Sequence, residues 1–111
     1  MDSRQQRIAR NEALFREVNE RIKEINADMT DAESEHSDFL CECGDDDCTK
    51  AVSMTVSEYE AVRENGKRFT IVPGHEIPDV ERVVFRGDRY AVVEKQPPAA
   101  ARIALETDPR S

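Results

Sequence analysis

The residues of this chain that are best suited to chemistry are three cysteines that lie close together. Cys41, Cys43 and Cys48 form the pattern C-x-C-x4-C, and Gly44 permits the sharp turn that would bring the third sulfur back to the first two. Unpaired thiolates this close would repel one another, so they favour a cation. An odd, clustered set of cysteines is a poor disulfide framework, and in a cytosolic chain it more often binds metal. The spacing therefore predicts a zinc site, with Zn²⁺ as the cofactor.

A tetrahedral zinc site needs a fourth donor, and the chain contains two histidines. His75 follows Pro73 and Gly74 at the end of a predicted strand, so its backbone would be held and its ring aimed. His36 lies in a polar segment, where fixing a ligand would cost more conformational entropy. We therefore expect His75 to complete the site, with His36 as the alternative. A site filled by four protein ligands has no open position for water, which favours a structural metal.

The same residues leave other chemistry open. Cys41 and Cys43 could oxidise to a disulfide and Cys48 could resolve a mixed disulfide, which would make the protein a thiol-based redox or zinc-release sensor. The ligand set could also hold an Fe–S cluster, and a three-ligand zinc open to water would be catalytic. The chain has no Gly-rich phosphate loop, no G-x-S-x-G and no H-E-x-x-H. We therefore expect that it is not an enzyme.

A long amphipathic helix is predicted within residues 1–29, ahead of the cysteines. Good helix formers dominate this region, and no glycine or proline occurs before Gly44. The apolar side chains follow a heptad spacing typical of a coiled coil: Ile8, Phe15, Val18, Ile22, Ile25 and Met29. One helix cannot bury such a seam by itself, so it must dock on the rest of the chain, pair with a second copy or bind another protein.

The remaining elements are predicted to form a small α+β metal-binding domain over residues 39–96, after a polar linker at 30–38. Alternating or apolar runs predict strands over 39–40, 52–56, 68–72, 81–86 and 89–95. The last two would form a hairpin around a two-residue turn at Gly87-Asp88. The expected fold class is α+β, with the long helix preceding a zinc-ribbon-like antiparallel sheet and one short helix.

Two further features complete the predicted architecture. Ser57 and Glu60 match the S-x-x-E capping box, which would open the short helix. Residues 97–111 begin with Pro97-Pro98 and continue with an alanine run, and we expect them to form a disordered tail.

Composition and charge exclude several classes of protein. The chain has 111 residues and no tryptophan, which bounds it to one domain with a small core. No apolar run approaches the ~20 residues of a membrane span, and no apolar secretory stretch occurs near Met1, so we expect a cytoplasmic protein. The net charge is −8, of which residues 1–38 contribute −4 and residues 39–50 contribute −3. This acidic balance argues against nucleic-acid binding. It favours solvated faces that keep a small protein in solution, with a basic partner as the alternative.

A set of motifs resembles a family of small uncharacterised bacterial proteins, over residues 10–95. The resemblance is carried by Arg10-Asn-Glu-Ala-Leu-Phe-Arg-Glu-Val-Asn-Glu-Arg-Ile22, Phe39-Leu-Cys-Glu-Cys43, Cys48, Glu58-Tyr59, Arg63, Phe69, Pro73-Gly-His-Glu76 and Val92-Val-Glu-Lys95. It implies an architecture and no activity, and it supports the three cysteines and His75 as the shared polar set. A looser likeness to zinc-containing anti-sigma factors departs from their H-x3-C-x2-C pattern, because His36 and the cysteines read H-x4-C-x-C.

The sequence as a whole predicts a zinc-stabilised, non-enzymatic protein-interaction or regulatory module of the bacterial cytoplasm. Its N-terminal helix would bind a protein partner or a second copy of the chain, and neither nucleic acid nor a membrane is expected as a partner.

Overall fold

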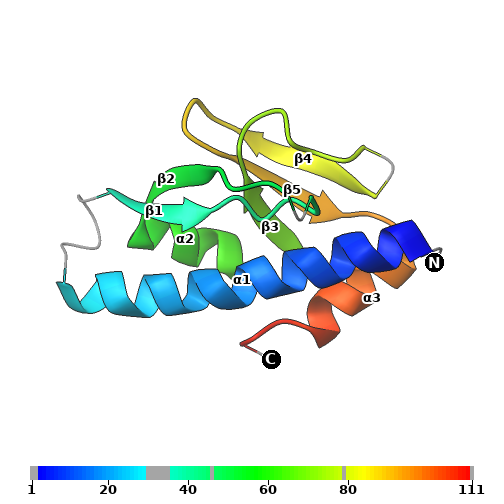
Figure 1. The fold of residues 1–111 in the computed structure, drawn as a ribbon, viewed down its shortest axis with the longest axis horizontal. Helices are drawn as coiled ribbons and strands as arrows, with labels where there is room; N and C mark the ends of the chain where they lie inside the picture. The colour runs from blue at the N-terminus through cyan, green and yellow to red at the C-terminus, as the bar shows by residue number, and fades with distance from the viewer. Residues whose placement is uncertain (1–2, 30–35, 46, 79, 111) are drawn as a thin grey trace.

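The fold is α+β, as the sequence predicts. The structure is a computed structural model that describes residues 3–29, 36–45, 47–78 and 80–110. Within these residues the elements are α1 (Ser3–Met29), β1 (His36–Leu40), β2 (Ala51–Thr55), α2 (Val56–Arg63), β3 (Arg68–Ile71), β4 (Glu81–Arg86), β5 (Ala91–Lys95) and α3 (Pro98–Glu106). The long α1 runs beneath the strands, and α3 packs below its N-terminal half (Figure 1).

Two antiparallel sheets organise the core. β1 pairs with β2, and β3, β5 and β4 form a three-stranded sheet in that order. Because side chains alternate along a strand, the three-stranded sheet contributes to two apolar clusters. Phe69 and Val93 join one cluster with Cys41 and Cys43, whereas Val92 joins another with Phe39. The cysteines are therefore part of a packed core.

α2 begins two residues earlier than the Ser57–Glu60 pattern predicts. The N-cap is Thr55, whose Oγ1 accepts from the Glu58 N–H at 3.0 Å, while the Thr55 N–H donates to Glu58 Oε1 at 2.8 Å. The capping box is therefore T-x-x-E, and the predicted S-x-x-E box is wrong. The two patterns overlap, and β2 ends at Thr55, so the helix begins directly after the strand.

The β4–β5 hairpin is confirmed, but its turn is longer than predicted. Arg86 pairs with Ala91, so four residues connect the strands instead of two. The Gly87 N–H donates to the Tyr90 carbonyl at 3.0 Å, and the ring of Tyr90 lies 5.2 Å from that of Phe85. This aromatic contact accompanies the wider turn.

The expected disorder of residues 97–111 is wrong for most of that segment. Pro98–Glu106 form α3, with proline in the first turn, where its missing N–H costs nothing. Ala100 and Ala104 are buried, and Ala104 belongs to the same cluster as Phe69. Packing against α1 and β5 stabilises a helix that would be marginal in isolation.

α1 is a single helix, but only part of its apolar seam docks. Among the described side chains of the helix, the buried ones are Ile8, Glu12, Arg16 and Asn19, three of which are polar. The seam residues Val18 and Ile25 stay exposed, while Phe15 and Ile22 are half-buried and the side chain of Met29 lies outside the described residues. The helix therefore docks through hydrogen bonds and ion pairs as well as through Ile8 and Ile22.

The linker prediction is tested only in part. Residues 30–35 lie outside the described residues, and residues 36–38 belong to β1. Among the described helices, none is long and apolar enough to cross a membrane.

Candidate metal centre

Cys41, Cys43, Cys48 and His75 come together at one end of the β1–β2 pair. Their sulfur and imidazole donor atoms all lie within 4.8 Å of one another. His75 Nδ1 is 3.6 Å from Cys41 Sγ and 3.7 Å from Cys48 Sγ. In a tetrahedral zinc site, Zn–S of about 2.3 Å and Zn–N of about 2.0–2.1 Å place sulfur and nitrogen about 3.6 Å apart. These two sulfur–nitrogen distances match a tetrahedral zinc site, and the four donors together are close enough to hold one metal ion.

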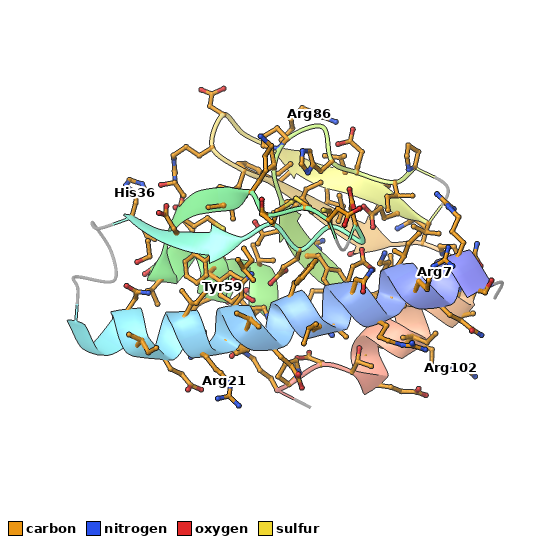
Figure 2. All side chains as sticks on the ribbon, in the orientation of Figure 1. Arg7, Arg21, His36, Tyr59, Arg86 and Arg102 are labelled. Carbon is orange, nitrogen blue, oxygen red and sulfur yellow. The ribbon has the colours of Figure 1, made fainter. Side chains whose placement is uncertain are left out.

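His36, the alternative ligand, lies away from this cluster. It opens β1 opposite Thr55, while the cysteines follow the other end of the strand at Leu40. At about 3.3 Å per residue, the strand separates His36 from Leu40 by about 13 Å. The ring is exposed at the outer end of the strand (Figure 2). Of the two histidines, only His75 is placed with the thiols.

Strand-like alternation explains how Cys41 and Cys43 reach the same side. The Cys41 N–H donates to the Lys50 carbonyl at 3.1 Å, which continues the β1–β2 ladder. The Glu42 N–H then donates to the Thr70 carbonyl at 2.8 Å, so this segment also pairs with β3. Residues i and i+2 of an extended chain face one side, and the residue between them faces the other. Cys41 and Cys43 are each only 2% exposed.

A tight loop brings the sulfur of Cys48 close to those of Cys41 and Cys43. The Cys48 N–H donates to the Asp45 carbonyl at 3.1 Å, and the Asp47 N–H donates to Asp45 Oδ1 at 2.9 Å. Asp45 and Asp47 are exposed, while Asp46 lies outside the described residues. The aspartates therefore turn the loop and face solvent, and the described ones stay out of the donor cluster.

His75 is held by a turn at the end of β3. The His75 N–H donates to the Val72 carbonyl at 3.0 Å, with Pro73 and Gly74 between them. Gly74 has φ of 95°, which side-chain-bearing residues rarely adopt and which the third position of a type II turn requires. The Val72 N–H also donates to Cys41 Sγ at 3.2 Å, so the same segment contacts two of the four donors.

Without a metal, the three thiols differ in acidity. A hydrogen bond from Cys43 lowers the pKa of Cys41, and the Val72 N–H acts in the same direction against the effect of burial. The bond that stabilises the Cys41 thiolate raises the pKa of Cys43, and burial adds to the rise. Burial also raises the pKa of Cys48. A metal ion must displace these protons, so acid weakens its binding.

Glu42, between the two buried cysteines, is the residue that sequence reasoning missed. Its side chain is fully buried and points away from the thiols into a polar site of its own. It accepts hydrogen bonds from Asn19 Nδ2 at 2.9 Å, Tyr59 Oη at 2.7 Å and the Thr70 N–H at 3.0 Å. Figure 2 shows Tyr59 between α1 and the strands. The signal was present in the C-E-C alternation, which sends the central carboxylate to the opposite face.

Comparison with known proteins adds no family. No family model matches the chain, and neither a curated protein nor a solved structure matches it. The resemblance to small bacterial proteins therefore stays a prediction.

Proposed function

We propose that this protein is a zinc-stabilised, non-enzymatic protein-interaction module. The observation that supports the proposal is the close grouping of three sulfurs and His75 Nδ1, with two sulfur–nitrogen distances of 3.6 Å and 3.7 Å. Four protein donors of this kind fill the coordination sphere of zinc and leave no position for a substrate. The core is small, and metal binding adds its free energy to folding in proteins of this size.

Metal analysis and cobalt substitution test the centre. Protein purified without added zinc is expected to contain about one equivalent per chain. The cobalt-substituted protein is expected to show the absorption of a tetrahedral site rich in thiolate, unchanged by added azide because no position is open. Metal content far below one equivalent would overturn the zinc proposal. A spectrum that azide alters would overturn the non-enzymatic assignment and favour an open, catalytic centre.

The two histidines supply a matched pair of variants. His75→Ala removes a donor and is expected to lose zinc to a chelator that the wild type resists. His36→Ala changes a histidine about 13 Å away along β1 and is expected to retain zinc like the wild type. The opposite result would assign the fourth ligand to His36.

The outer face of α1 is the contact surface that we propose for a partner. Leu14, Val18 and Ile25 are 54%, 37% and 58% exposed, and their spacing places them in one stripe. A groove of about 710 Å³ adjoins Leu14, between α1 and the segment after α3, and includes Ala13 and Pro109.

The stripe covers about 16 Å of helix, a length that one short helix can occupy when it lies in a groove. We propose a helix of another protein, laid along the stripe and the adjoining groove. A photo-reactive residue at position 18 should cross-link one recurrent protein in cells, and Leu14→Glu should abolish the product. A dimer in solution that Leu14→Glu dissociates would instead show self-association.

A second candidate function, a thiol-based redox sensor, is favoured by access to the cluster. A hollow of about 290 Å³ is lined by Cys43 and His75, and Cys48 is half-buried. Two-electron oxidation by a peroxide would join two of the thiolates as a disulfide, reduce the peroxide to water or alcohol, and release the metal. Mild peroxide followed by zinc release and disulfide mapping tests this function. Thiols that stay reduced until the protein unfolds would exclude it.

A further inference from the structure

The contacts between α1 and the cysteine loop suggest a regulatory role for the metal. We propose that metal binding and the docking of α1 stabilise one another, so that release of the metal frees α1 from the strands. This inference rests on the proposed metal centre. Two separate sets of contacts connect the helix to residues that flank the metal ligands.

The first set joins the start of α1 to Gly44, the residue after Cys43. Gly44 is buried against Ile8, so closely that a Cβ on Gly44 would lie 3.1 Å from the Ile8 Cα. One turn later, Asn11 Nδ2 donates to the Gly44 carbonyl at 3.1 Å. The helix therefore rests directly on the backbone of the loop that carries the cysteines.

The second set centres on Asn19, in the middle of α1. Asn19 Oδ1 accepts the Leu40 N–H at 2.8 Å, and Nδ2 donates to the Leu40 carbonyl at 2.9 Å. Nδ2 also donates to Glu42 Oε2 at 2.9 Å. Asn19 is fully buried, and the three hydrogen bonds of its amide are made to Leu40 and Glu42, the residues on either side of Cys41. It is a positioning residue, since it contacts no metal ligand side chain.

These contacts depend on the metal because the loop geometry does. Without an ion, Cys41, Cys43 and Cys48 hold no common ligand, so the segment between them loses a cross-link to His75. Leu40 stays paired with Ala51, but the Gly44 carbonyl and the Glu42 side chain lie in that segment and become less fixed, so Asn11 and Asn19 lose well-aligned partners. A hydrogen bond made to a moving acceptor contributes little, whereas a buried polar group left unpaired is costly.

The character of the docked face makes α1 responsive to such small shifts. Glu12, Arg16 and Asn19 dominate the docked face of α1, whereas the exposed stripe on its outer face is apolar. Polar groups recover hydrogen bonds with water when they separate, so a polar interface holds a smaller net free energy than its contacts suggest. An apolar interface of the same area would tolerate a displaced loop, because hydrophobic contact does not depend on direction.

Thermodynamic linkage turns this coupling into a reciprocal prediction. If zinc raises the docking equilibrium of α1 by some factor, docking of α1 must raise zinc affinity by the same factor. A change in α1 that touches no ligand should therefore weaken zinc binding. Residues that position metal ligands typically contribute 10- to 100-fold to affinity, which sets the expected scale at about tenfold or more.

Zinc affinity of the full chain, measured by competition with a chromophoric chelator, provides the first test. Asn19→Ala is expected to weaken zinc binding about tenfold. Val18→Ala alters the neighbouring exposed position on α1 and is expected to bind zinc like the wild type. Thr55→Ala removes the α2 N-cap, which lowers global stability without touching α1 or the loop, and it is also expected to keep wild-type affinity. Wild-type affinity in Asn19→Ala would overturn the coupling.

Amide hydrogen exchange of the full chain, with zinc bound and after its removal, provides the second test. Amides within residues 12–20 are expected to lose protection by about the factor seen in the affinity measurement, while those of β5 stay protected. Unchanged protection of α1 after zinc removal would overturn the inference, as would cooperative unfolding of the whole chain. A wild-type protein that binds no zinc at all would overturn the proposed metal centre instead.

Discussion

Gly44 and Ile8 meet with no room for a side chain between them. A Cβ on Gly44 would lie 2.9 Å from the Ile8 Cβ, closer than such atoms approach in folded proteins. The contact joins residues from opposite sides of the linker, and it fixes how closely α1 can approach the cysteine loop. The glycine after Cys43 therefore serves two purposes, since it allows the loop to turn and lets the helix sit on it.

Gly44→Ala is expected to displace the start of α1. The methyl group meets the Ile8 Cβ and backbone, which cannot simply rotate away, so overpacking should cost about 1–3 kcal/mol of unfolding free energy. Urea unfolding measures the loss, and exchange of amides near Ile8 locates it. Wild-type stability with unchanged exchange would show that the helix approaches the loop less closely.

Gly74→Ala is the contrasting substitution. A Cβ at Gly74 meets nothing within 4 Å, but φ of 95° is unfavourable for alanine. The expected cost is about 1–2 kcal/mol of backbone strain. Because Gly74 precedes His75, the substitution should lower zinc affinity more than it lowers the exchange protection of α1. Equal effects of the two glycine variants on α1 exchange would contradict this distinction.

Glu12 predicts an unusual dependence of stability on pH. Lys95 Nζ lies 2.8 Å from Glu12 Oε2 and 2.8 Å from Glu81 Oε1, so two buried carboxylates share one ammonium. Burial raises the pKa of Glu12 to about 8, Lys95 opposes the rise, and Glu81 adds to it. The folded protein thus holds a proton that the unfolded chain releases near its ordinary pKa of 4.5. This stabilising contribution is complete below that pH and is lost as pH rises through about 8.

Urea unfolding of zinc-loaded protein between pH 5 and pH 8 tests this linkage. Relative to Glu12→Gln, the wild type is expected to lose up to about 1.4 kcal/mol of unfolding free energy per pH unit. The Glu12→Gln variant is the proper reference because pH-dependent metal binding affects both proteins alike. Parallel stability curves for the two proteins would show that Glu12 is ionised throughout.

Arg16 is expected to be the polar residue whose loss is most costly. It is fully buried, donates to the Gly66 carbonyl at 2.8 Å and the Ala104 carbonyl at 2.6 Å, and stacks 4.5 Å above the Phe69 ring. Arg16→Met keeps much of the apolar contact but leaves two carbonyls unpaired, so about 2–4 kcal/mol should be lost. Thermal unfolding measures the change, and α3 amides should lose protection first. An unaffected α3 would assign its stability to other contacts.

The donor cluster could be predicted from sequence because its chemistry is local. Cys41, Cys43 and Cys48 lie in one loop, and Pro73-Gly74 predicts the turn that positions His75. The choice between His75 and His36 depended on backbone order, which a strand followed by a turn supplies. Glu42 could have been found by the same alternation that pairs Cys41 with Cys43.

The docking of α1 could not be predicted, because its partners are remote. Glu12 meets Lys95 across 83 positions and Arg16 meets Ala104 across 88, and no local pattern relates such pairs. Hydrophobic periodicity pointed instead to the seam through Val18 and Ile25, which the structure leaves exposed. The disordered-tail prediction for α3 was wrong for a related reason, since that short helix depends on the surface that α1 provides.

The alternation of Cys41, Glu42 and Cys43 also determines the register of β1. A slip of β1 by one residue would turn Glu42 toward the thiol cluster and place a thiol beside Asn19 and Tyr59. Either exchange places the wrong chemical group in a site that admits one kind of ligand. The thiol cluster on one side and the amide–phenol pair on the other each accept only one of the two groups, so short strands with few apolar residues gain a unique alignment.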